Sequence, residues 1–126
     1  MRRPLCLIIA ALALVSCQGS PSGSSAEIDL SEFEIQPSLS SFEEGMVALD
    51  VVNEGEYGHT LVITDAGGHV LSAGDVIEAG ETSTTSIDLV PGDYFFTCRI
   101  VAQDDEGNVI DHYEMGMSAE VTVRAG

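Results

Sequence analysis

The chain has no lysine and only four arginines, against 21 aspartate and glutamate residues in a length of 126. Its formal charge is −17, so its surface repels phosphate backbones and anionic lipid headgroups. This composition argues against a nucleic-acid-binding protein and against a membrane contact made through basic residues. Any partner that is attracted by charge should be basic.

The sequence also lacks helical signals, because no segment keeps an apolar helical period over three turns. Short β-branched segments alternate instead with turns such as Gly67-Gly68 and Pro91-Gly92-Asp93. Seven or eight short strands in about 100 residues predict an all-β protein, a Greek-key β-sandwich. We expect these strands near residues 28–35, 46–53, 59–64, 82–89, 93–101 and 118–124.

The N-terminus has the pattern of an export signal. Arg2 and Arg3 precede an apolar run, Leu5 to Val15, that is too short to span a membrane. The run ends in Leu14-Val15-Ser16-Cys17, which resembles the lipobox of bacterial and archaeal lipoproteins, where cleavage before the cysteine leaves its thiol to be lipidated. The alternative is an ordinary secretory signal with a chance cysteine at its end.

This resemblance implies a division of the chain into three parts. Residues 1–16 would be a lipoprotein signal peptide, 17–26 the lipidated Cys17 with a flexible Gly/Ser tether, and 27–126 the folded domain. We therefore expect a protein that is lipid-anchored to the cell membrane on its extracytoplasmic side. Loss of both signal arginines would take the formal charge from −17 to −19.

The cysteines divide in the same way. Cys6 would leave with the signal and Cys17 would carry the lipid, so Cys98 would be the one free thiol of the mature chain and no intramolecular disulfide could form. An unpaired thiol in an oxidising compartment is a liability unless it is buried or bound.

Four side chains of the second half form a set of metal ligands. His59 follows a glycine turn, Cys98 lies on an apolar strand, and His112 and Met117 have the spacing His-x4-Met. Soft sulfur stabilises Cu(I) while imidazoles keep Cu(II) bound, so the set suits a copper electron-transfer site. Met115 is the alternative to Met117.

Three segments carry a family resemblance in chain order. They are Val52-Asn53 through Gly58-His59, then Gly80-Glu81 with Leu89 to Cys98, then His112 to Met117 with the strand that follows. Together they resemble the ligand segments of cupredoxins, the blue-copper family that includes plastocyanin and azurin.

The resemblance implies a monomeric electron carrier, not an enzyme, with one type 1 copper bound by His59, Cys98, His112 and Met117. Its partner would be a basic extracytoplasmic redox protein. The resemblance also implies that Asn53 and Thr97 hydrogen-bond to each other and tie the two ligand loops together.

The sequence departs from the family between Cys98 and His112, where thirteen residues, 99–111, replace a loop of a few. This segment reads as a strand, an acidic glycine-containing turn and a strand, so it predicts an inserted hairpin. Such a hairpin would return His112 to the neighbourhood of Cys98 across the ladder. Two alternatives stay open: a lipoprotein that delivers copper, and a metal-free cupredoxin-like binding or structural domain.

Three further features are expected to have ordinary structural roles. His69 matches no motif and reads as a loop histidine, and Tyr94 is placed to make a tyrosine-corner hydrogen bond. The acids Asp104-Asp105-Glu106 read as a solvated hairpin tip and not as a calcium site.

Overall fold

The computed structural model describes residues 23–126, which form eleven strands. No helix long and apolar enough to cross a membrane is found in this part of the chain. The signal peptide and Cys17 predicted above lie outside the described residues. The strands are β1 (Gly23–Ser31), β2 (Glu34–Pro37), β3 (Ser41–Glu43), β4 (Gly45–Asn53), β5 (Val62–Asp65), β6 (Val70–Ala73), β7 (Thr82–Leu89), β8 (Gly92–Thr97), β9 (Val101–Gln103), β10 (Val109–Asp111) and β11 (Ser118–Arg124).

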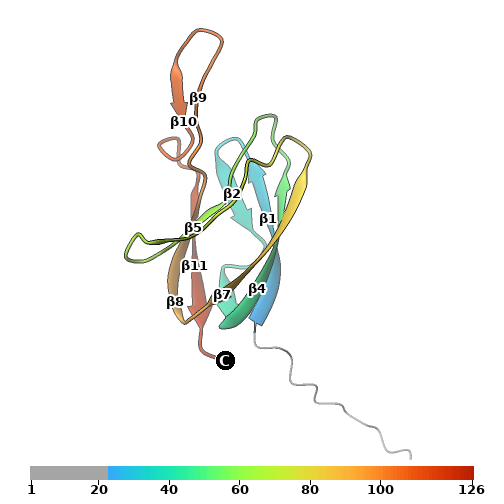
Figure 1. Ribbon diagram of the computed structural model, residues 1–126, viewed down its shortest axis with the longest axis vertical. Coiled ribbons are helices and arrows are strands. Elements are labelled where there is room, and N and C mark those ends of the chain that lie inside the picture. Colours follow the sequence, from blue (N-terminus) through green and yellow to red (C-terminus); the bar gives the residue numbers. More distant parts are fainter. Residues whose placement is uncertain (1–22) are drawn as a thin grey trace, which may run out of the picture.

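Two sheets pack into the predicted sandwich (Figure 1). The first has the order β2-β1-β4-β7 and the second the order β3-β11-β8-β5-β6. β1 pairs with β4, and β3 with β11, in parallel, while the other neighbours within these two sheets are antiparallel. The all-β sandwich is therefore confirmed, with more strands than the seven or eight expected because several are only three or four residues long.

The core follows from alternation within each strand. In β4, Val47, Leu49 and Val51 are buried while the residues between them are more exposed, as a strand with one face on a core requires. Phe42 and Phe96 contribute the largest buried rings from the second sheet, with centroids 6.3 Å apart. Burial of such side chains is the main force that holds the two sheets together.

The first strand begins earlier than the sequence predicts. Residues 23–26, which were expected to belong to a flexible tether, pair in parallel with Met46 to Leu49 of β4. The run of small residues gave no apolar period there, but backbone hydrogen bonding needs none. The tether prediction is therefore wrong for these residues.

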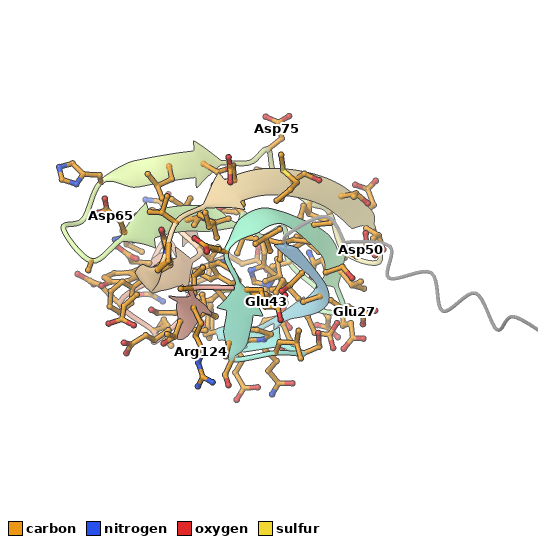
Figure 2. The ribbon with its side chains drawn as sticks, turned by 90° about the horizontal axis from the view of Figure 1, so that it is seen from below. Glu27, Glu43, Asp50, Asp65, Asp75 and Arg124 are labelled. Atoms are coloured by element: carbon orange, nitrogen blue, oxygen red, sulfur yellow. The ribbon has the colours of Figure 1, made fainter. Side chains whose placement is uncertain are left out.

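The inserted hairpin is confirmed. β9 and β10 form a separate two-stranded antiparallel sheet in which Val109 faces Gln103 and Asp111 faces Val101. Figure 1 shows this hairpin extending beyond the sandwich, at the end opposite to the start of β1 and to the C-terminus. Carboxylates are spread over the outer surface, and Figure 2 shows Glu27, Asp50, Asp65 and Asp75 toward the outline of the molecule and Glu43 near the middle of the view.

Candidate metal centre

Three loops at the hairpin end of the sandwich bring the predicted ligands together. His59 lies between β4 and β5, where its amide and carbonyl pair with Ile77 in an isolated bridge. Cys98 directly follows β8, the middle strand of its sheet, and its amide donates to the Met117 carbonyl at 3.2 Å. His112 directly follows β10, and its amide donates to the Ile100 carbonyl at 3.0 Å. Rigid strands therefore hold the backbone at each position.

The donor atoms of these residues form a small triangle. His59 Nδ1 lies 3.2 Å from His112 Nδ1, and Cys98 Sγ lies 3.9 Å and 3.5 Å from these two nitrogens. The point equidistant from all three atoms is about 2.1 Å from each, which is the length of a metal–nitrogen bond in proteins. The arrangement thus fits a metal ion without movement of the backbone.

The chemistry of the triangle is as informative as its size. His59 and Cys98 are fully buried and His112 is 3% exposed, so the donors are shielded from water. Burial, together with the neighbouring His59, lowers the pKa of His112 and keeps its imidazole neutral, as a ligand must be. Two imidazoles with one thiol are compatible with a type 1 copper site.

The two methionine candidates have opposite environments. Met117 is fully buried and packs in the core cluster that contains Cys98, whereas Met115 is 57% exposed. Residues 112–116 form a turn, which the Met117 amide closes by donating to the His112 carbonyl. Met117 is therefore the methionine that lies close to Cys98, whose amide donates to the Met117 carbonyl.

The inserted hairpin keeps His112 close to Cys98, but the cross-strand partner of His112 differs from the one expected. His112 lies opposite Ile100 in the ladder and not opposite Cys98. The His112 imidazole still reaches Cys98 Sγ, because Ile100 lies only two residues after Cys98 in the chain. Phe33 packs edge-on against the His112 ring, with centroids 5.1 Å apart.

The predicted hydrogen bond between Asn53 and Thr97 does not form. Asn53 Nδ2 donates instead to the carbonyls of Tyr57 and Ile77 at 2.7 and 2.8 Å, and Thr97 Oγ1 donates to the Val62 carbonyl. Asn53 therefore orders the loop before His59 by itself. The prediction failed because two backbone carbonyls lie within reach of the amide, that of Tyr57 in the loop after β4 and that of Ile77 in the loop between β6 and β7.

Thr60, and not the pair Asn53 and Thr97, links the loop of His59 to the loop of Cys98. Its amide and its hydroxyl lie 3.4 Å and 3.7 Å from Cys98 Sγ, and its hydroxyl oxygen accepts from the Arg99 amide at 3.4 Å. That incoming hydrogen bond leaves the hydroxyl proton free to point at the sulfur. No spacing rule in the sequence identified this residue.

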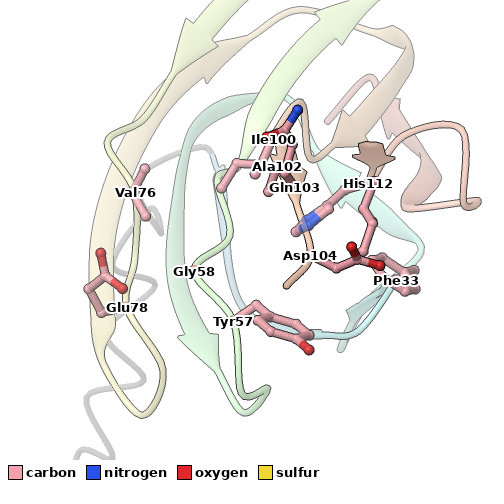
Figure 3. A pocket seen from close by; sticks show the side chains of 11 residues that line it. Phe33, Tyr57, Gly58, Val76, Glu78, Ile100, Ala102, Gln103, Asp104 and His112 are labelled. Carbon is pink, nitrogen blue, oxygen red and sulfur yellow. The ribbon is translucent and has the colours of Figure 1, made fainter. Parts of the chain in front are cut away.

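A groove opens above His112, between the hairpin and the sandwich. Figure 3 shows Tyr57, Gly58 and Val76 on one wall and Ile100 and Ala102 on the other. Its volume is about 240 Å³, and its lining also includes Phe33, Glu78, Gln103, Asp104, Ile110 and His112.

The residues expected to have structural roles have them. His69 is exposed in the β5–β6 turn and pairs with Asp65 at 3.1 Å. The Tyr94 hydroxyl donates to the Val90 carbonyl at 2.6 Å, four residues earlier in the chain. Asp104 accepts hydrogen bonds from two amides of the hairpin turn, which makes it a turn residue at an exposed tip.

Fold and site together define a copper-protein scaffold, and the comparisons agree. The family model of the cupredoxin-like domain matches residues 4–110, so the chain belongs to this family. The match ends within β10 of the inserted hairpin, so it includes neither His112 nor Met117. No curated protein shows significant sequence similarity to the chain.

Solved structures give the same fold at low sequence identity. A dithionite-reduced auracyanin from the photosynthetic bacterium Roseiflexus castenholzii is 19% identical with a TM-score of 0.61, covering 80% of this chain and 96% of that one. A purple cupredoxin from Nitrosopumilus maritimus is 16% identical with a TM-score of 0.53, covering 79% and 99%. A reduced amicyanin variant is 15% identical with a TM-score of 0.51, covering 78% and 80%.

Proposed function

We propose that the protein carries single electrons through one type 1 copper, which His59, Cys98, His112 and Met117 would hold. The observation that carries this proposal is the buried triangle of donor atoms, whose size matches metal–ligand bonds. Copper bound there would supply a one-electron Cu(I)/Cu(II) couple. The chain's own residues fix the donors and exclude water, so little rearrangement accompanies a change of charge.

The groove above His112 is the face at which we propose that a redox partner docks. Its walls include apolar side chains that are exposed, with Tyr57 58% and Val76 49% accessible. Carboxylates of Glu78 and Asp104 border this apolar surface. Charge complementarity therefore favours a basic redox protein that inserts an apolar group into the groove.

The position of the metal centre, at the hairpin end of the sandwich, also suits a protein that is anchored at its N-terminus. β1 begins at the end of the sandwich opposite to the hairpin (Figure 1). A lipid on Cys17, which is part of this proposal, would leave the groove facing away from the membrane. The domain would then act as an extracytoplasmic monomer on a tether.

Redox cycling of the copper-loaded protein tests the electron-carrier role. We expect a reversible one-electron wave in voltammetry, with one copper retained per chain after repeated reduction and reoxidation. Loss of the metal to a Cu(I) chelator in the first reduction would contradict electron transfer and favour a role in copper delivery.

Electron exchange with a basic c-type cytochrome as a probe tests the docking face. We expect the second-order rate to fall as ionic strength rises, and to fall on neutralising Asp104, Asp105 and Glu106 to their amides. The control is the double change Glu43→Gln and Glu44→Gln at the opposite end of the sandwich. Equal losses in both variants would contradict docking at the groove.

A further inference from the structure

The turn between β1 and β2 touches both histidines of the site, although it is distant from them in the sequence. Glu32 and Phe33 form this turn. Glu32 Oε1 lies 3.3 Å from His59 Nε2, and the Phe33 ring packs edge-on against His112. One short turn therefore contacts both imidazoles, although it is not part of any loop that carries a ligand.

The Glu32 carboxylate is held firmly in this position. Its Oε1 accepts hydrogen bonds from the amides of Glu56 at 2.7 Å and Tyr57 at 2.9 Å. Gly55 makes the approach possible, because a Cβ at that position would collide with the carboxylate. Two amide donors on one oxygen favour the ionised form of the carboxyl group over the neutral acid.

The backbone of the turn is strained at Phe33. Its φ of 61° lies in the left-handed region, which a bulky L-residue rarely adopts. Such conformations persist where surrounding contacts determine them, and they gather at functional sites. Here those contacts are the ones that Glu32 and Phe33 make with the ligand loops.

The carboxylate determines which nitrogen of His59 can bind metal. A carboxylate only accepts hydrogen bonds, so the proton of the neutral imidazole belongs on Nε2. Nδ1 then keeps its lone pair, and Nδ1 is the atom that faces Cys98 Sγ and His112 Nδ1. A carboxylate that accepts a hydrogen bond from one nitrogen of an imidazole also makes the other nitrogen a stronger metal ligand.

We propose that Glu32 is a positioning residue of the metal centre, which fixes His59 with Nδ1 as the donor and favours Cu(II) over Cu(I). This inference rests on the proposed copper function. The direction of the effect on the reduction potential is defined. The Glu32 carboxylate makes His59 a stronger metal ligand, which stabilises Cu(II) more than Cu(I) and so lowers the reduction potential.

The variant Glu32→Gln separates charge from geometry. The amide keeps an oxygen that can accept from the Glu56 and Tyr57 amides and from Nε2, but it carries no charge. We expect one copper per chain, a Cu(II) affinity about tenfold weaker and an unchanged Cu(I) affinity. The potential should then be about 59 mV higher, which is a tenfold change for one electron. Glu32→Asp keeps the charge and should return part of the shift.

Glu34→Gln is the matched control, since Glu34 begins β2 in the same hairpin and its carboxylate accepts from exposed Gln36. We expect its potential to equal that of the wild type. A potential for Glu32→Gln equal to or below that of Glu34→Gln would overturn the proposal.

A measurement on the copper-free protein keeps the two proposals distinguishable. Nitrogen-15 NMR of the wild type should show His59 with its proton on Nε2, and Glu32→Ala should show a mixture of both tautomers in a folded chain. An unchanged tautomer in Glu32→Ala would refute the positioning role. A wild type that has the expected tautomer but binds no copper would refute the proposed function and leave the positioning of His59 in place.

Discussion

Removal of the Thr60 hydroxyl tests the hydrogen bonding around Cys98. Thr60→Val deletes the group that lies 3.7 Å from Cys98 Sγ and keeps a β-branched side chain of similar volume. The Thr60 amide, at 3.4 Å from the same sulfur, is unaffected. The variant therefore removes one of the two donors that Thr60 directs at the thiolate.

The expected magnitude follows from the geometry. The bond is long, so we assign it about 1 kcal/mol, which is below the range of about 1.5–3 kcal/mol for hydrogen bonds to charged groups. Cu(I) leaves more negative charge on the sulfur than Cu(II), so the hydroxyl stabilises the reduced form and its loss lowers the potential. A difference of about 1 kcal/mol between the two oxidation states is about fivefold in an equilibrium constant, so the full strength of the bond sets a maximum shift of about 40 mV for one electron.

Spectroelectrochemical titration of the copper-loaded variant measures this shift. Thr60→Ser is the control, because it keeps the hydroxyl and should have a potential close to that of the wild type. A potential that rises in Thr60→Val, or equal shifts in the valine and serine variants, would refute the reasoning. The downward shift is also opposite in sign to the one expected for Glu32→Gln, so a general loosening of the site cannot produce both results.

Three further predictions concern stability and the outer contacts of the site. Tyr94→Phe loses a 2.6 Å hydrogen bond to a backbone carbonyl and should lower the free energy of unfolding by about 1 kcal/mol, measured by urea denaturation. Hydrogen bonds from Asn108 lower the pKa of Asp104, so the hairpin turn should keep its NMR amide shifts above about pH 4 and lose them as the pH falls through that lowered value. Gly55→Ala should displace the Glu32 carboxylate and raise the reduction potential in the direction of Glu32→Gln.

Each of these has an outcome against it. An unchanged unfolding midpoint for Tyr94→Phe would mean that the hydroxyl finds water as good a partner as the carbonyl. Turn amides that change near neutral pH would show that Asp104 is not the group that titrates. A wild-type potential in Gly55→Ala would mean that the loop moves aside without disturbing Glu32.

The fold could be predicted from the sequence because its information is local. Alternation such as that of β4, and turns such as Pro91-Gly92-Asp93, specify strands and their ends without any knowledge of neighbours. The hairpin was predictable for the same reason, since Asp104 to Gly107 form a turn between two short apolar segments. The strand at residues 23–26 was not, because its pairing with β4 depends on backbone groups and leaves no pattern of side chains.

The site could be predicted only in part. The order and spacing of His59, Cys98 and His112 identified the three side chains that the structure brings together. Their outer contacts were beyond reach, because Glu32 meets His59 across 27 positions and Thr60 meets Cys98 across 38. A carboxylate in a turn and a threonine beside a histidine are ordinary residues until the fold places them.

Stoichiometric addition of Cu(II) to the purified protein tests the central claim most directly. We expect binding of one copper per chain with an intense visible thiolate-to-copper absorption, and loss of that absorption in Cys98→Ser. A colourless wild-type complex, or colour that persists in Cys98→Ser, would contradict a copper centre built on His59, Cys98 and His112.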